Sequence, residues 1–310
     1  MIVCERLTKY FGHITAIKEL SIEIPDGEVF GLLGPNGAGK TTTMRMLACL
    51  IKPSFGSAKI DDLEIGPENN NLKIRSKIGL LTETPGLYDS LGAYKNLDYY
   101  AQFFDISKSK REENIESILK NLGLWNRRHT PVGEFSKGMK QKIAIARALI
   151  HEPKYIFLDE PTASLDPQAA KTVREYILEL KSKGNTILIN THNLNEAEKV
   201  CDRVALLKNK MIKVGKPKEM AHGLFGRNIK VTLDRFPKSI TDKMLKFDYI
   251  TEAKIQNNQL VLNVKNPEED NNRIITWLLE QGLKVQFISE EEYSLEDVYL
   301  KLIDEEADEQ

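Results

Sequence analysis

Residues 34–41 combine residue types and a spacing that could bind a phosphate group. They read Gly-Pro-Asn-Gly-Ala-Gly-Lys-Thr and fit the pattern G-x-x-x-x-G-K-[ST] at every constrained position. Glycines allow positive φ and bring several backbone N–H groups close to one anion. An ordinary glycine-rich turn is the alternative interpretation. If the segment binds a nucleotide, we expect contacts from Gly34, Pro35, Asn36, Gly37, Ala38, Gly39, Lys40, Thr41 and Thr42.

The segments on either side of this loop favour phosphate binding. Residues 29–33 form an apolar run that predicts a buried strand, and residues 42–50 contain helix formers with no breaker. A helix that begins at the loop adds the positive end of its dipole and its unpaired N–H groups. In this setting the Lys40 ammonium would reach the β- and γ-phosphates, and the Thr41 hydroxyl would ligate Mg²⁺. The sequence therefore predicts a site for a nucleoside triphosphate and Mg²⁺.

Two adjacent carboxylates, Asp159 and Glu160, end a second apolar run at residues 155–158. Such a run is typical of a central parallel strand that is covered on both faces. In open α/β sheets the chemistry lies beyond the carboxyl ends of the strands. We expect Asp159 to hold Mg²⁺, directly or through water, and Glu160 to accept a proton from the attacking water or to orient it. A solvated strand end is the alternative, which a complete phosphate loop disfavours.

Three ring-bearing side chains are further candidates for contacts with the nucleotide. His192 follows the apolar strand predicted at residues 186–191 and could donate to the γ-phosphate, although a lone histidine is more often structural. Tyr10 and Phe11 lie upstream of the loop. Either could stack on adenine, and either could equally pack in the core.

Two helix starts carry polar caps. Ser136 stands at an N-cap position before the helix predicted at residues 140–150, which could be an ordinary cap or a second helix start that faces phosphate. Asp166 precedes Pro167, a combination typical of the first turn of a helix.

The composition indicates a globular protein. The chain has 310 residues, of which 41% are hydrophobic and 29% charged, and its net charge of −1 gives no electrostatic case for nucleic acid. Its three scattered cysteines suit a reducing cytosol. The first residues lack the basic start and apolar core of a signal peptide, and no uncharged apolar stretch approaches the ~20 residues that span a bilayer. Any membrane role therefore requires a partner.

Periodicity predicts an α/β domain over residues 1–220, interrupted by a helical subdomain at about 88–150. A polar stretch at residues 66–71 separates two of its strands. Residues 226–303 follow the order βαββαβ and predict a small ferredoxin-like α+β domain with a regulatory or interaction role. The acidic tail at residues 304–310 is expected to be disordered.

These segments, in this order, resemble the ATP-binding subunit of an ABC transporter. The resemblance rests on residues 34–41, 135–139, 156–160, 164–166 and His192, and it covers about the first 220 residues. Five ordered motifs are far more specific than a phosphate loop alone. The resemblance implies the P-loop NTPase fold of an ABC-type nucleotide-binding domain, ATP hydrolysis with Mg²⁺, and a head-to-tail dimer that encloses two ATP molecules.

In such a dimer, the phosphate loop and catalytic residues of one subunit face the signature segment, residues 135–139, and Asp166 of the other. The segment reads Phe-Ser-Lys-Gly-Met where the family usually has Leu-Ser-Gly-Gly-Gln, so a serine and the second glycine are retained. The resemblance thus implies trans contacts from Ser136, Lys137, Gly138, Met139 and Asp166.

The family pattern also bears on two other positions. Phe11 matches the adenine-stacking aromatic residue better than Tyr10 does. Glu83 stands where the family has a glutamine that touches Mg²⁺ and signals to the membrane subunit. A glutamate retains an oxygen for the nucleotide-bound cation and lacks the amide donor.

The second unit resembles the C-terminal extension of drug-export ATPases, including its ending at residues 294–300. The resemblance implies an export ATPase, peripheral on the cytoplasmic face of the cell membrane, whose partners are integral membrane permease subunits and an identical or different ATP-binding subunit. A soluble ABC ATPase that acts on ribosomes or nucleic acid is the alternative. The single cassette and the absence of a heptad array and of net basic charge disfavour it. An ATP-binding sensor with little turnover is a third hypothesis.

Overall fold

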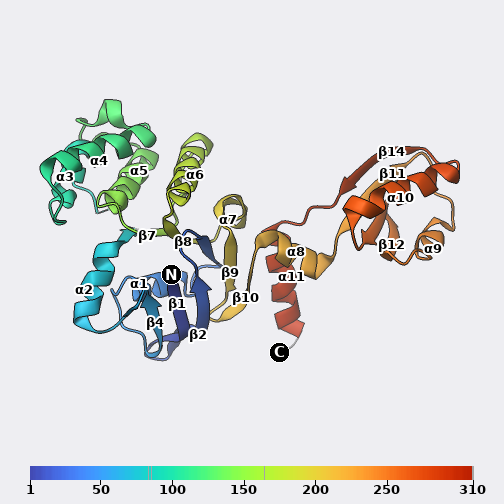
Figure 1. Ribbon diagram of the computed structural model, residues 1–310, viewed down its shortest axis with the longest axis horizontal. Helices are drawn as coiled ribbons and strands as arrows, with labels where there is room; N and C mark the ends of the chain where they lie inside the picture. Colours follow the sequence, from blue (N-terminus) through green and yellow to red (C-terminus); the bar gives the residue numbers. More distant parts are fainter. Residues whose placement is uncertain (83, 85, 164, 309–310) are drawn as a thin grey trace. The chain divides into compact units, whose positions relative to one another are not determined.

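The computed structural model describes residues 1–82, 84, 86–163 and 165–308 (Figure 1). The chain divides into two compact units, Met1–Gly215 and Lys216–Gln310. Each unit contains its own cluster of buried apolar side chains, which is the usual mark of an independent domain. Within the described part of the chain, no helix has the length and apolar character needed to span a bilayer.

A six-stranded sheet forms the centre of the first unit. Its order is β10-β9-β3-β8-β7-β6, and all neighbours are parallel except β10, which pairs antiparallel with β9. Every residue of β3, β7 and β8 is buried, as their apolar runs predict. Parallel pairing brings the carboxyl ends of these three strands to one edge. The strands are β3 (Val29–Leu33), β6 (Ile78–Leu81), β7 (Tyr155–Asp159), β8 (Thr186–Thr191), β9 (Arg203–Leu207) and β10 (Met211–Gly215).

A second, antiparallel sheet of order β2-β1-β4-β5 completes the core of this unit. Its strands are β1 (Ile2–Phe11), β2 (Ile14–Ile24), β4 (Phe55–Ile60) and β5 (Leu63–Glu64). One buried cluster contains side chains from both sheets and from α1 (Lys40–Leu47), including Met44 and Met46 of that helix. This packing fixes the start of α1 between the two sheets.

Helices group beside the sheets. Figure 1 shows α3, α4 and α5 together in green, apart from the blue sheet of β1, β2 and β4. This group contains α3 (Ala93–Ala101), α4 (Lys108–Asn121), the short turns η1 (Trp125–Arg127) and η2 (Val132–Glu134), and α5 (Lys137–Leu149). Two further helices, α6 (Pro167–Ser182) and α7 (Leu194–Val200), precede and follow β8.

One helix lies where the sequence indicated only a polar connection. The helix α2 spans Glu68–Lys77 and buries a single side chain, Ile74. Because three consecutive asparagines and two apolar residues, of which one is exposed, give almost no amphipathic pattern, periodicity could not identify it. Asn71 stabilises its start, since its side chain accepts from Gly66 N at 2.8 Å and donates to Gly66 O at 3.1 Å.

The second unit has the predicted ferredoxin-like topology. Its four strands pair antiparallel in the order β12-β13-β11-β14, which corresponds to the βαββαβ order of the sequence. The βαββαβ elements are β11 (Asn228–Leu233), α9 (Ile240–Met244), β12 (Ile250–Gln256), β13 (Gln259–Val264), α10 (Pro267–Glu280) and β14 (Val285–Glu290).

Two more helices belong to this unit, α8 (Pro217–Phe225) and α11 (Leu295–Asp308), and they contact each other. The expectation of a disordered acidic tail was wrong for residues 304–308, because α11 continues through them. Within this helix an i,i+4 ion pair joins Lys301 and Glu305 at 3.7 Å.

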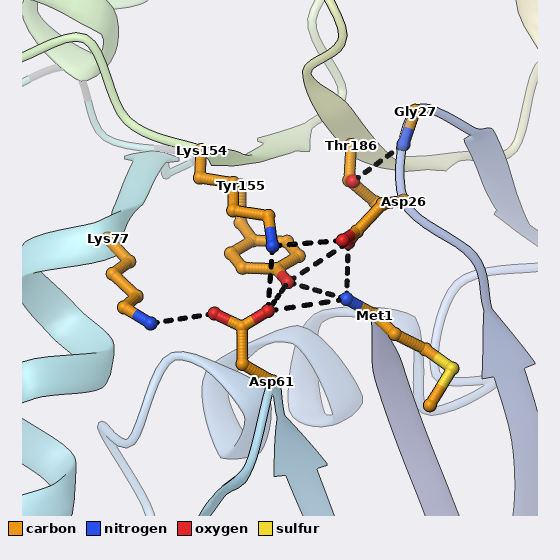
Figure 2. A network of polar contacts seen from close by, with 8 residues as sticks. All are labelled: Met1, Asp26, Gly27, Asp61, Lys77, Lys154, Tyr155 and Thr186. Carbon is orange, nitrogen blue, oxygen red and sulfur yellow. Dashed lines mark hydrogen bonds and ion pairs between the residues drawn. The ribbon is translucent and has the colours of Figure 1, made fainter.

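A polar network lies at the amino ends of the central strands. Figure 2 shows contacts among Met1, Asp26, Asp61, Lys77, Lys154 and Tyr155. The hydroxyl of Tyr155, the first residue of β7, lies 2.5 Å from Asp61 Oδ1 and 3.1 Å from Asp26 Oδ1. Lys154 Nζ lies 2.7 Å from Asp61 and 2.9 Å from Asp26. These contacts join the turns before β3 and after β4 to the start of β7, at the opposite ends of the strands from Asp159.

Candidate active site

Glycine shapes the loop that joins β3 to α1. Gly34 and Gly39 have φ values of 148° and 97°, a region that other residues rarely adopt. A Cβ atom on Gly34 would lie 2.2 Å from the carbonyl oxygen of Leu207, and one on Gly39 would lie 2.4 Å from that of Ala16. Both positions therefore require glycine for conformation and for space, because the loop packs directly against neighbouring backbone.

Lys40, the first residue of α1, points back over this loop. It is 6% exposed, and its ammonium donates to the carbonyl oxygens of Gly34, at 2.6 Å, and Pro35, at 3.0 Å. Burial lowers the pKa of Lys40, while the charges of Glu160 and Asp159 act to raise it. The site thus holds a buried cation within reach of an anion placed in the loop.

Thr41 and Asp159 meet across the sheet edge. The Thr41 hydroxyl donates to Asp159 Oδ2 at 2.9 Å, and the buried amide of Asn190 lies 3.3 Å from Asp159 Oδ1. Asn190 stands directly opposite Asp159 in the β7–β8 pairing. A hydroxyl and a carboxylate at one point form an oxygen-only donor pair, which suits a hard cation such as Mg²⁺.

Glu160 is the first residue after β7 and has a φ of 50°. Its Oε1 accepts from the backbone N–H of His192 at 3.0 Å and lies 2.7 Å from His192 Nδ1. Its Oε2 accepts from the hydroxyl of Thr191 at 3.0 Å. The carboxylate is therefore oriented from the end of β8, a strand that lies some 30 positions later in the chain.

The contact with Glu160 determines the tautomer of His192. An ionised carboxylate only accepts hydrogen bonds, so Nδ1 carries the proton in this contact. A neutral ring then has a lone pair at Nε2. Donation from Nε2 to a phosphate oxygen would require a proton on that nitrogen, either as a second proton on the ring or through a change of tautomer once the ring has left Glu160. The His192 side chain is 60% exposed and has room to move.

The signature segment places its polar residues at the start of α5. Ser136 is the N-cap of this helix, and its hydroxyl accepts from Met139 N at 3.3 Å. A Cβ on Gly138 would lie 3.4 Å from Leu165 Cδ2. Within the same subunit, the Gln141 side chain reaches the carbonyl oxygens of Glu160 and Pro161, at 3.3 and 3.4 Å.

These elements surround a cavity of about 550 Å³, the central cavity. Its lining comes from the phosphate loop, the ends of β7 and β8, and the start of α5. The lining residues are Asn36, Gly37, Ala38, Gly39, Lys40, Thr41, Thr42, Lys137, Gln141, Asp159, Glu160, Ala163 and His192. The structure therefore brings most of the expected catalytic and loop residues to one place.

The remaining candidates lie elsewhere or outside the described residues. Phe11 ends β1, is 49% exposed, and has Lys9 Nζ 5.0 Å above its ring. Asp166 caps α6 by accepting from Ala169 N at 2.9 Å, as expected from the sequence. Glu83, expected to contact nucleotide and metal, and Ser164 lie outside the residues that the structure describes.

Comparisons with known proteins identify the family of each unit. Residues 17–163 match the ABC transporter family, and residues 215–303 match the C-terminal domain of ATP-binding proteins like DrrA1-3. The bacitracin transport ATP-binding protein BcrA of Bacillus licheniformis is 35% identical, over 96% of this chain and 95% of that protein. The linearmycin resistance ATP-binding protein LnrL of Bacillus subtilis is 28% identical, over 97% of this chain and 98% of that one.

This chain belongs to the ATP-binding proteins of ABC transporters. Its fold also resembles the dimeric, post-hydrolysis structure of the ATP-binding cassette MJ0796 bound to ADP and Pi. The TM-score is 0.64 at 29% identity, over 70% of this chain and 98% of that one. As an ABC ATPase, the chain hydrolyses ATP.

Sequence reasoning missed several residues that support the site of this ABC ATPase. Asn209 donates to the carbonyl oxygens of Thr15 and Gly37, both at 3.0 Å, and so fixes the phosphate loop from the turn after β9. Asn190, Thr191 and Gln141 were not identified either. The sequence signal for Asn209 is an asparagine in a turn, and that for Asn190 and Thr191 is a pair of polar residues at the end of an apolar strand. Neither signal is specific without the fold.

Proposed function

We propose that the central cavity binds the phosphates of ATP and that Glu160 is the general base for the attacking water. The observation that supports this most directly is the convergence of the phosphate loop, Asp159 and Glu160 around one cavity. Lys40 would bind the β- and γ-phosphates, and His192 would contact the γ-phosphate. Phe11, exposed at the end of β1, would stack on adenine.

The proposal includes Mg²⁺, held by Thr41 and Asp159, with Glu83 as an expected third contact. The donor set fits this ion: a hydroxyl and a carboxylate, 2.9 Å apart, leave the other positions to water and phosphate oxygens, as Mg²⁺ prefers. No cluster of three or more acidic, histidine or cysteine ligands occurs among the described residues, which is consistent with a site that the nucleotide completes. When bound, Mg²⁺ would neutralise charge on the phosphates.

We further propose a head-to-tail dimer that encloses two ATP molecules. Ser136, Lys137, Gly138 and Met139 of one subunit, together with Asp166, would face the nucleotide of the other. The MJ0796 cassette, which this chain resembles in fold at 29% identity, is dimeric, and this supports the formation of a dimer. Ser136 retains a hydroxyl at a helix start, where backbone N–H groups favour an anion.

The transport direction that we propose is export, through separate integral membrane permease subunits on the cytoplasmic face of the membrane. The support is the similarity to a bacitracin transport protein and a linearmycin resistance protein over nearly the whole chain. The match of residues 215–303 to a DrrA-type C-terminal domain adds to it. We assign this second domain, residues 226–303, a regulatory or interaction role.

The test uses full-length tagged Glu160→Gln protein, which should bind ATP and accumulate as a closed dimer because hydrolysis reopens it. Light scattering should show the mass doubling on addition of ATP and Mg²⁺, and wild-type protein is the control. A mild-detergent pull-down from the native cells should then recover an integral membrane protein in stoichiometric amount.

Two results would contradict different parts of this proposal. Unchanged turnover in Glu160→Gln would remove Glu160 from the role of base. Recovery of ribosomes or nucleic acid, with no membrane protein, would leave the ATPase chemistry intact and favour a soluble ABC ATPase over a transporter subunit.

A further inference from the structure

Thr191 is the last residue of β8 and contacts Glu160, the proposed base. It is 3% exposed, and its hydroxyl oxygen lies 3.0 Å from Asn193 N and 3.0 Å from Glu160 Oε2. The backbone N–H of Asn193 can only donate, so a lone pair of the hydroxyl accepts it. The ionised carboxylate of Glu160 can only accept, so the hydroxyl hydrogen is directed to Oε2. The neighbours therefore determine the direction of both hydrogen bonds.

The two oxygens of Glu160 are held in different ways. Oε1 is contacted by His192, whose side chain is 60% exposed and is expected to contact phosphate. Oε2 is contacted by Thr191, which is buried on a central strand and is absent from the described lining of the central cavity. If the imidazole turns toward the nucleotide, the Thr191 hydroxyl and the His192 backbone N–H still orient the carboxylate.

From this geometry we propose that Thr191 is a positioning residue for hydrolysis: it holds the Glu160 carboxylate in the orientation that activates water. This inference rests on the proposed role of Glu160 as general base. Thr191 lines no part of the central cavity as the described residues define it, so it acts through Glu160 rather than on the substrate. A misplaced base loses rate in the chemical step while substrate binding is retained.

A purely structural role is the competing explanation. Asn193 caps α7 by accepting from Glu196 N at 3.0 Å, and Thr191 contacts the backbone of that same cap. Loss of the hydroxyl could therefore loosen the start of α7 and affect the site indirectly. The experiment must separate this effect from the loss of orientation at Glu160.

The test compares Thr191→Val and Thr191→Ser in full-length protein, with single-turnover and steady-state ATP hydrolysis as readouts. Valine matches the shape of threonine and lacks the hydroxyl, whereas serine retains it. We expect Thr191→Val to lower kcat by roughly 10- to 100-fold with KM within about twofold of wild type. Thr191→Ser should restore most of kcat.

Thr8→Val is the matched control. Thr8 is also 3% exposed, and its hydroxyl likewise accepts from a backbone N–H, that of Glu19, and donates to an oxygen, that of Arg6. It lies on β1, outside the contacts of Glu160. This variant should therefore show the cost of losing a buried threonine hydroxyl and keep the wild-type kcat.

A double-mutant cycle with Glu160→Gln provides the sharpest readout. If Thr191 acts through the carboxylate, Thr191→Val should cause no further loss in the Glu160→Gln background. An equal additional loss there, or a lowered kcat in Thr191→Ser as well, would show a structural role and overturn the proposal. If Thr191→Val is unstable, Thr191→Ala in the same cycle serves instead.

The outcomes also separate this inference from the proposed function. A wild-type kcat in Thr191→Val beside a strongly lowered kcat in Glu160→Gln would overturn the positioning role alone. Wild-type turnover in Glu160→Gln would overturn both, because no base would then remain to be positioned.

Discussion

Lys40 illustrates how single residues prepare this site for an anion. Its ammonium is buried and donates to two carbonyl oxygens of the loop that it would share with phosphate. A buried cation is costly unless it is paired, and carbonyl dipoles compensate it less well than phosphate oxygens would. In the proposed site, the phosphate loop would therefore gain a favourable charge pair on binding ATP.

We expect Lys40→Ala to weaken ATP binding by roughly 10- to 100-fold, because hydrogen bonds to charged groups contribute about 1.5–3 kcal/mol. Calorimetric titration with ATP and Mg²⁺ measures this. Arg45→Ala is the matched control, since Arg45 is an exposed cation near the end of the same helix. Near-normal affinity in Lys40→Ala would contradict the assignment of the phosphate loop.

At the scale of elements, the carboxyl and amino ends of the central strands carry different sets of polar residues. Asp159, Glu160 and Thr191 lie at or just beyond the carboxyl ends of β7 and β8, around the proposed chemistry. The amino ends carry the network of Figure 2, in which Asp61 accepts from Lys77, Lys154 and Tyr155. Changes to this network should therefore affect stability more than catalysis.

Acid should weaken the network. Burial alone would raise the pKa of Asp26, but hydrogen bonds from the Met1 amino group, Lys154 and Tyr155 lower it to about 2. The pKa of Asp61 is likewise lowered by hydrogen bonds from Lys154, Lys77 and Tyr155 that outweigh burial. Because both folded-state pKa values lie below the usual value near ~4, the stabilisation is present above that pH. It is lost as the pH falls through the folded-state values.

Asp61→Asn should therefore lower the free energy of unfolding at pH 7 by roughly 1–3 kcal/mol, a difference that shrinks toward low pH as the wild-type carboxyl is protonated. Urea unfolding at a series of pH values measures it. Asp62→Asn, at an exposed neighbour, is the control. A deficit that does not change with pH would exclude the charged network as its source, and a large fall in ATPase activity at pH 7 would contradict the division between strand ends.

At the scale of the molecule, the chain consists of two units with separate cores. All residues that line the central cavity belong to Met1–Gly215. The C-terminal unit is a ferredoxin-like sandwich with its own sheet and helices, and none of its described residues lines that cavity.

Deletion of residues 216–310 should accordingly leave basal ATPase activity within roughly threefold of wild type. The measurement is steady-state phosphate release by the purified first unit, with circular dichroism as the control for folding. Complete loss of activity in a folded product would mean that the second unit helps to build the site.

The sequence by itself determined the nucleotide loop, the carboxylates after β7 and the order of elements in both units. These features are local: a loop of glycines and a lysine, an apolar run that ends in acids, and a period of two or 3.6 residues can each be recognised within a short window. The order βαββαβ was sufficient to predict the ferredoxin-like topology of the second unit.

Only the tertiary structure decided which side chains orient the reacting groups. Asn190 meets Asp159, and Thr191 meets Glu160, because β7 and β8 pair in one register across 31 positions of sequence. Asn209 reaches the phosphate loop from the turn after β9, because β9 pairs in parallel with β3, the strand that precedes this loop. Pairing between distant strands depends on the free energy of the whole core, so no local pattern encodes it.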